Sequence, residues 1–199
     1  MEQELFLRRN ILFNKYESLK SYFDTSVGNI NLDDDIEHEY NYFDYKKKNV
    51  DLPQYILCSL FVTWFSFIEV EIRNIVLYSL DNKKTDIEQF RYCGLDHIRK
   101  FFVKNDVEID SSLWVKMNIL KDIRNRIVHE GPFFNVFSQR ISEECKEYIE
   151  SNKLYRSESK SIFQANYEFI EEVLIFGNEF LESNIKDLSK LIQDDINYT

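Results

Sequence analysis

One short segment of the 199-residue chain, residues 120–131, holds the two side chains best suited to chemistry, Arg124 and His129. A histidine titrates near neutrality and can take or give a proton at cytosolic pH. An arginine stays charged and binds phosphate oxygens bidentately. Together they suffice to cleave RNA without a metal, because His129 can activate a ribose 2′-hydroxyl while Arg124 stabilises the crowded phosphate of the transition state. DNA lacks the 2′-hydroxyl, so we expect it to be inert.

The same two residues also admit a purely structural interpretation. Arg124 can be the partner of a buried carboxylate, and His129 can interact with the helix dipole at a C-terminus. On one helix the two residues are rotated by about 140° and displaced by about 7.5 Å, so they converge poorly within a single copy. Two antiparallel copies about a two-fold axis would place four such groups around one cleft.

The element that must carry these residues is a predicted helix with its N-cap at Ser111 or Ser112, running to about His129. Gly131 and the proline after it end the helix, as these residue types usually do. Arg124 falls at the edge of the apolar stripe of this helix. A guanidinium there is costly to bury unless it is paired.

A second predicted helix, from residue 53 to about residue 80, offers partners for Arg124. It is the most hydrophobic stretch of the chain, and Glu69 and Glu71 lie on opposite flanks of its apolar stripe. A salt bridge from Arg124 to either glutamate would compensate the charge. Helical spacing places Glu71 nearer the core, and the choice between the two stays open.

Arg124-Asn125, three intervening residues and His129 resemble the RN-xxx-H motif of the HEPN family. The segment 67–73 and the long final helix are also similar to such domains, so the resemblance covers about residues 53–190. It implies a helical bundle that dimerises through the motif helix. It also implies a metal-independent RNase that serves as a toxin or in antiphage defence.

The resemblance also implies roles for single residues. Arg124 and His129 would be catalytic, and Asn125 would position the site or the phosphate. Glu69 matches the acidic support of the family better than Glu71, although helical spacing favours Glu71.

Three further cations are candidates for contacts with the RNA backbone: Lys121, Arg126 and Arg73. Exposed charges that keep the protein soluble are an equally good interpretation of them. One departure from the family concerns HEPN toxins controlled by a nucleotidyltransferase antitoxin, which carry a tyrosine two residues after the histidine. Gly131 stands there in this chain, which puts control by modification at that position in doubt.

Helices dominate the expected fold, because the chain has only four glycines and two prolines. We expect an all-α, mostly up-and-down bundle of five or six helices. The expected organisation is an N-terminal helix with a connecting segment over 1–52, the HEPN-like bundle over 53–192 and a C-terminal tail over 193–199.

Smaller elements are predicted from periodicity and turn signals. Further helices are expected at 3–24, 85–92, 94–104, 141–152 and 165–192. An apolar-rich loop is expected at 133–140, the helix at 141–152 is expected to be exposed, and 153–164 fits either a short β-hairpin or a loop.

Charge and cysteine usage limit the partners and the compartment. The net charge of −10 disfavours broad DNA binding, without excluding a local basic site. Three widely spaced cysteines without a CxxC pair are typical of reduced thiols in a cytosolic protein, and no spacing predicts a zinc site or another cofactor. The N-terminus has no signal core, and the uncharged run 52–68 is short and polar for a membrane span. We therefore expect a cytoplasmic protein without a membrane partner.

Two classes of function compete. The first is a homodimeric ribonuclease whose partners are RNA, a second copy and an antitoxin or defence component. The second is a non-catalytic HEPN-like subunit that binds RNA or protein within a defence or toxin–antitoxin complex. A helical bundle with a chance motif and an unrelated role is the third alternative.

Overall fold

The computed structural model describes residues 51–81 and 93–197, together with Asn14, Glu17, Ser18, Ser21, Tyr22 and Thr25. Within that part of the chain, five helices and one two-stranded antiparallel sheet form the fold, which confirms the expected all-α class. Of the two alternatives for 153–164, the structure has the hairpin. The elements are α3 (Leu52–Asp81), α4 (Leu95–Lys104), α5 (Ser111–Glu130), α6 (Glu143–Ser151), β1 (Tyr155–Arg156), β2 (Ser159–Phe163) and α7 (Tyr167–Asn197).

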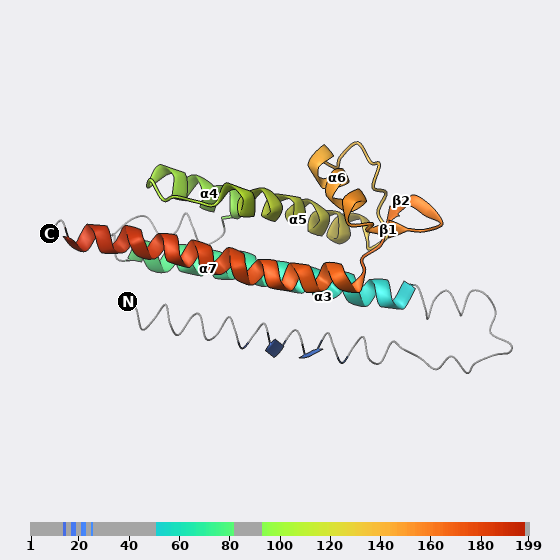
Figure 1. The fold of residues 1–199 in the computed structure, drawn as a ribbon, viewed down its shortest axis with the longest axis horizontal. Helices are drawn as coiled ribbons and strands as arrows, with labels where there is room; N and C mark the ends of the chain where they lie inside the picture. Colours follow the sequence, from blue (N-terminus) through green and yellow to red (C-terminus); the bar gives the residue numbers. More distant parts are fainter. Residues whose placement is uncertain are drawn as a thin grey trace.

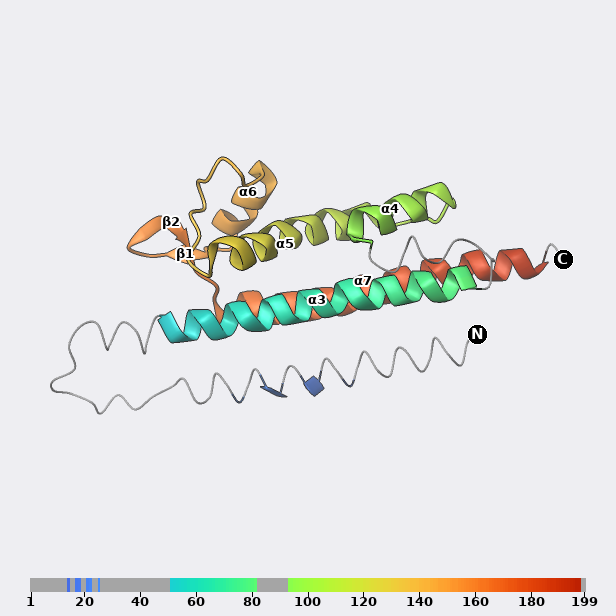
Figure 2. The ribbon, with the colours of Figure 1, turned by 180° about the vertical axis from the view of Figure 1, so that it is seen from behind.

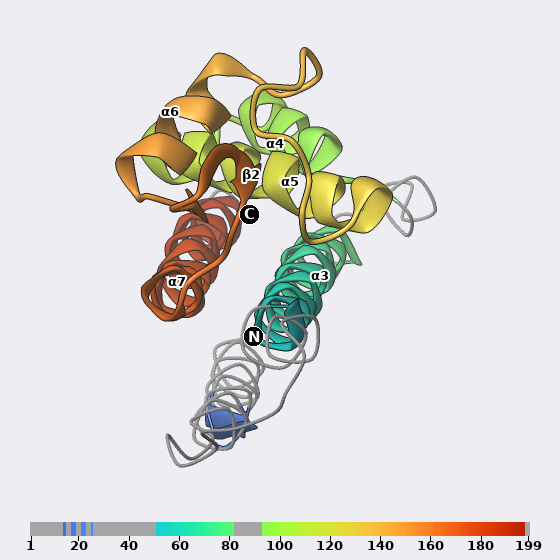
Figure 3. The same ribbon diagram turned by 90° about the vertical axis from the view of Figure 1, so that its right-hand side faces the viewer.

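The three long helices alternate in direction. Helices α3 and α7 lie side by side and run the same way, whereas α5 runs opposite to both (Figure 1). Viewed from behind, α4, α5 and α6 form a second layer over this pair (Figure 2). The view along the bundle shows α5 lying over α3, with the hairpin over the start of α7 (Figure 3).

Close contacts join α3 to α7 along a seam that we call the α3–α7 seam, formed by Phe61, Trp64, Phe169, Val173 and Gly177. The indole Nε1 of Trp64 donates to the Val173 carbonyl at 3.1 Å. A Cβ atom at Gly177 would lie 2.6 Å from this Nε1, so only a glycine permits the approach. The Phe61 and Phe169 rings pack with their centres 5.2 Å apart. The helix pair is therefore held by shape as well as by apolar area.

Helix α5 is capped at both ends. Asp110 is its N-cap and accepts from the backbone N–H groups of Ser112 (2.9 Å) and Leu113 (3.3 Å), so the predicted cap at Ser111 or Ser112 was wrong by one or two residues. The Ser112 hydroxyl and these N–H groups lower the pKa of the Asp110 carboxyl. At the other end Gly131 has φ of +90°, and its N–H donates to the Ile127 carbonyl at 3.0 Å.

The predicted loop at 133–140 pairs with the hairpin. The Val136 N–H donates to the Ser161 carbonyl at 2.8 Å, and the Phe163 N–H donates to the Phe134 carbonyl at 3.0 Å. The rings of Phe134 and Phe163 stack with centres 4.6 Å apart. The residues that follow α5 are thus fixed against β2.

Helix α6 is less exposed than predicted. Its side chains Cys145 and Ile149 are fully buried, because they face α5 while the glutamates of α6 face outward. Burial raises the pKa of the Cys145 thiol to about 12.

Other boundaries differ from the prediction by a few residues. Helix α4 starts at Leu95, one residue after the expected start at Gly94, which is its N-cap. Helix α7 starts two residues late and continues to Asn197, so most of the expected tail over 193–199 is helical. The helix expected at 85–92 lies outside the described residues. Of the helix expected at 3–24, the described residues are helical and exposed.

Helix α3 contains a segment, Leu52–Leu77, long and apolar enough to cross a membrane, with a mean hydropathy of 1.6. Half of that segment is buried inside the bundle. This burial is compatible with the predicted core helix of a soluble protein.

Candidate functional site

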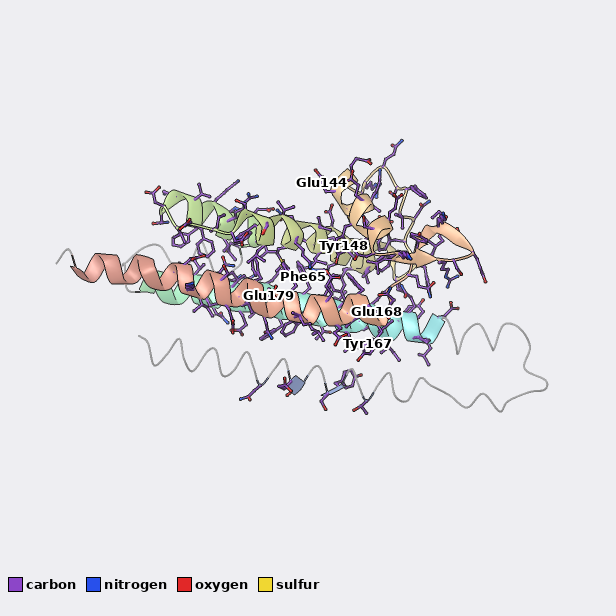
Figure 4. All side chains as sticks on the ribbon, viewed as in Figure 1. Phe65, Glu144, Tyr148, Tyr167, Glu168 and Glu179 are labelled. Atoms are coloured by element: carbon purple, nitrogen blue, oxygen red, sulfur yellow. The ribbon has the colours of Figure 1, made fainter. Side chains whose placement is uncertain are left out.

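Arg124 is held by three contacts, two of them with α3 and one with its neighbour on α5. Its Nη2 forms an ion pair with Oε2 of Glu69, and its Nη1 donates to Oδ1 of Asn125 at 3.0 Å. Its Cζ lies 5.2 Å from the centre of the Phe65 ring, which lies between α3 and α5 (Figure 4). The Nε of Arg124 is buried, and no acceptor reaches it from the described residues. The guanidinium is therefore oriented, and its buried Nε–H is left unused.

The structure shows which of the two glutamates of α3 forms the ion pair with Arg124. Arg124 pairs with Glu69, and both side chains keep about a fifth of their surface exposed, 21% and 18%. Glu71 is buried at 7%, as helical spacing predicted. The predicted salt bridge to α3 is thus confirmed with Glu69 as the partner.

His129 lies in the last turn of α5 and is exposed to solvent. It forms no hydrogen bond or ion pair with any residue that the structure describes. Gly131, two residues after His129, has a positive φ and is the C-cap of the helix. The imidazole is therefore open to an incoming molecule, whereas Arg124 is partly covered.

Gln54 fixes this end of α5 and was missed at the sequence level. Its Nε2 donates to the Pro132 carbonyl at 2.8 Å, and its Oε1 accepts from the Ala165 N–H at 3.0 Å. The side chain is 1% exposed. The available signal was a lone amide inside an uncharged run, because a buried amide needs partners.

A pocket of about 380 Å³ adjoins this end of α5. We refer to it as the α3–α5 pocket. Its wall includes Tyr55, Ser59 and Thr63 of α3, and Ile127, Val128 and Pro132 at the end of α5. Cys58 forms part of the wall, and burial raises the pKa of its thiol to about 12, so it stays a neutral thiol.

The three other predicted cations have intramolecular partners. Lys121 pairs with Asp96 of α4 at 2.9 Å. Arg126 pairs with Glu130 and donates to the Arg140 carbonyl. These contacts tie α5 to α4 and to the segment after it.

Arg73 is also engaged, since its Nε donates to the Cys93 carbonyl at 3.1 Å. RNA contacts by Lys121, Arg126 and Arg73 stay a prediction, and none of the three cations extends unpaired toward His129. In the described ranges, no group of three or more His, Cys, Asp or Glu side chains is arranged to hold a metal ion.

Comparison of the chain with protein-family models, with curated protein sequences and with solved structures gives no match.

Proposed function

We propose that the protein is a HEPN-type endoribonuclease that cleaves RNA without a metal and acts as a toxin or antiphage effector in the cytoplasm. The observation that carries the proposal is the pairing on α5 of an oriented guanidinium with an exposed imidazole. Arg124 is fixed by Glu69 and Asn125, and His129 is open at the helix end. The spacing of these residues resembles the family motif.

The proposed chemistry needs only these side chains and the substrate. Neutral His129 takes the proton of a ribose 2′-hydroxyl, and the 2′-oxygen attacks the adjacent phosphorus. The bond from phosphorus to the 5′-oxygen breaks, and that oxygen receives a proton. Arg124 stabilises the charge that builds on the phosphate oxygens. The products are a 2′,3′-cyclic phosphate and a 5′-hydroxyl, with one proton taken and one returned.

The proposal includes a homodimer formed through α5. His129 and Arg124 are rotated by about 140° on the helix, so one copy does not direct both at one phosphate. A second antiparallel copy supplies the complementary pair. The second imidazole can then protonate the leaving 5′-oxygen.

The test uses wild type, His129→Ala and Arg124→Ala, with His97→Ala as the matched control. His97 is an exposed histidine on α4 and outside the motif. We expect wild type and His97→Ala to cleave single-stranded RNA equally in EDTA, and each motif variant to lose at least about 100-fold in rate. Circular dichroism checks that the variants remain folded. Full activity in both motif variants would reject the catalytic assignment.

A second candidate is a non-catalytic HEPN-like subunit that binds RNA or protein in a defence or toxin–antitoxin complex. The observation that favours it is the engagement of Lys121, Arg126 and Arg73 in internal contacts, which occupies the three cations predicted to contact a phosphate chain. Purified protein that is inactive on total RNA and co-purifies with one fixed partner would support this alternative.

A further inference from the structure

We propose that the α3–α5 pocket binds a nucleobase of single-stranded RNA, with the Tyr55 ring as the stacking surface. This inference rests on the proposed ribonuclease function and names the part of the substrate that the site grips. It assigns the sugar–phosphate chemistry to Arg124 and His129, and the recognition of a neighbouring base to α3.

The first argument is position. The pocket wall contains Ile127 and Val128, and Val128 is the residue directly before His129. Pro132, which closes the wall, is held in place by the buried Gln54. A nucleotide bound at the end of α5 therefore has this hollow beside it. The volume of about 380 Å³ falls within the usual range of small-ligand pockets.

The second argument is that the exposed ring of Tyr55 is already held in one orientation. Tyr55 is 53% exposed, yet its ring is held edge-to-face against Phe133 with centres 5.7 Å apart. The guanidinium carbon of Arg156 lies 4.5 Å from the centre of the Phe133 ring. Nη2 of Arg156 forms an ion pair with Oδ1 of Asp51 at 3.0 Å. An exposed ring with so little freedom loses little entropy when a base stacks on it.

The third argument is a contrast between hydroxyl groups on one helix. The Ser66 hydroxyl donates to the carbonyl four residues earlier, at 2.8 Å, as helical serines commonly do. The Ser59 and Thr63 hydroxyls line the pocket and make no such bond within the described part of the chain. They lie one and two helical turns beyond Tyr55 on the same face, so they can bond to the edge of a stacked base.

The fourth argument is charge. Among the described residues that line the pocket there is no carboxylate or cation, although the chain carries a net charge of −10. A base is the neutral part of a nucleotide and suits this wall, whereas a phosphate does not. An adjoining hollow of about 300 Å³ shares Tyr55, Ser59 and Thr63 and adds Tyr22. This surface of α3 thus has room for a second nucleotide of the RNA.

The test measures binding apart from cleavage, with 2′-O-methyl single-stranded oligonucleotides that cannot be cut. Fluorescence anisotropy compares wild type, Tyr55→Ala and Phe137→Ala. Phe137 is the matched control, because it is also an aromatic residue at 53% exposure and lines neither hollow. We expect Tyr55→Ala to bind about 5- to 150-fold more weakly and Phe137→Ala to match wild type.

A series of oligonucleotides with one base removed at each position identifies the stacked base. One position should weaken binding to wild type as much as Tyr55→Ala does. Binding to Tyr55→Ala should not weaken further at that position, because the same contact is already absent. Equal losses in both proteins at every position would overturn the pocket assignment.

The outcomes separate this inference from the proposed function. Cleavage that needs His129, together with unchanged binding by Tyr55→Ala, overturns the base pocket and leaves the nuclease standing. Binding that needs Tyr55 without any cleavage supports the pocket and favours the non-catalytic alternative. A change in oligomeric state in Tyr55→Ala, with unchanged RNA affinity, overturns the inference and assigns the face to contact between copies.

Discussion

Helix α3 is packed in two different ways on its two sides. On the α3–α7 seam, Trp64 has its N–H paired, and Gly177 leaves no space for even one more methyl group. On the α5 side, a pocket remains open, and Arg124 keeps a buried Nε without an acceptor in the described structure. Trp114 Nε1 and Arg156 Nε are also buried without a partner among the described residues, so the open pocket carries the contrast. Unfilled volume costs stability, and natural proteins tolerate it mainly at functional sites. The comparison therefore separates the side that holds the bundle from the side that is available for binding.

The largest expected effect is on cleavage. Arg124→Lys keeps the charge and loses the planar fork that binds two phosphate oxygens. We expect the cleavage rate to fall about 1000-fold, equivalent to about 4 kcal/mol of transition-state stabilisation, while the free energy of unfolding falls by only about 1 kcal/mol. Single-turnover kinetics and urea unfolding measure the two quantities. A variant that is strongly destabilised yet cleaves normally when folded would assign Arg124 to structure alone.

Gln54→Leu tests the residue that joins both sides of α3. The change leaves the Pro132 carbonyl and the Ala165 N–H without their partner in a buried position. We expect the free energy of unfolding to fall by about 3 kcal/mol, because each orphaned group costs about 1–3 kcal/mol. Urea unfolding gives the value, and Gln139→Leu, at an exposed loop position, should stay within about 0.5 kcal/mol of wild type. An equal effect in both variants would remove Gln54 from this role.

Gly177→Ala tests the α3–α7 seam. It should lower stability and leave cleavage unchanged, whereas Arg124→Lys should lower cleavage and change stability little. The added Cβ meets Trp64 Nε1 at 2.6 Å, and this overpacking outweighs the gain in helix propensity. We expect a loss of about 2 kcal/mol in the free energy of unfolding, with cleavage per folded molecule unchanged. In a Trp64→Phe background the same change should cost less, because the contact with Nε1 is gone and only that with Ile68 Cδ1, at 2.9 Å, remains. If the losses in the free energy of unfolding caused by Gly177→Ala and Trp64→Phe simply add in the double variant, the two side chains do not clash and the helices move apart freely.

The smallest expected effect, counted for one thiol over one pH unit, is a dependence of stability on pH. Burial holds the pKa of the Cys58 and Cys145 thiols at about 12, whereas thiols of an unfolded chain titrate near about 8.5. Between these values the unfolded chain releases protons that the folded protein keeps, so stability falls as pH rises. Each thiol contributes a loss of up to about 1.4 kcal/mol per pH unit.

Urea unfolding between pH 9 and 10.5 measures this slope, and Cys58→Ser and Cys145→Ser should each reduce it equally. Cys145 lies beneath α6, whereas Cys58 lies at the wall of the pocket. A slope unaffected by Cys58→Ser would mean that the pocket admits water as far as Cys58, which would sharpen the contrast between the two sides of α3.

Much of the bundle followed from local patterns. The scarcity of glycine and proline, the apolar stripe of α3 and the stop at Gly131 predicted the helices that the structure contains. The N-cap of α5 was misplaced because Asp110, Ser111 and Ser112 are all good caps, and only the backbone geometry selects Asp110. The burial of α6 was missed because only Cys145 and Ile149 of its nine residues are buried.

The candidate site was predictable in its residue types but not in its partners. Helical spacing placed Arg124 at the edge of its stripe, and a charge there required a carboxylate. Helical spacing placed Glu71 nearer the core, whereas the structure pairs Arg124 with Glu69. The spacing gives the depth of each flank of α3, but it does not say which neighbouring helix lies beside that flank.

The sequence by itself determined that the chain is helical and where most helices end. It also placed Arg124 at the edge of the apolar stripe of α5 and His129 at the end of the same helix. These properties depend on neighbours within a few residues along the chain. The tertiary structure alone decided that Glu69 holds Arg124, that Gln54 fixes the turn after His129, and that a pocket opens beside Val128. Those facts depend on how three helices are positioned against one another, which is set by contacts such as Trp64 against Gly177, far apart in the chain.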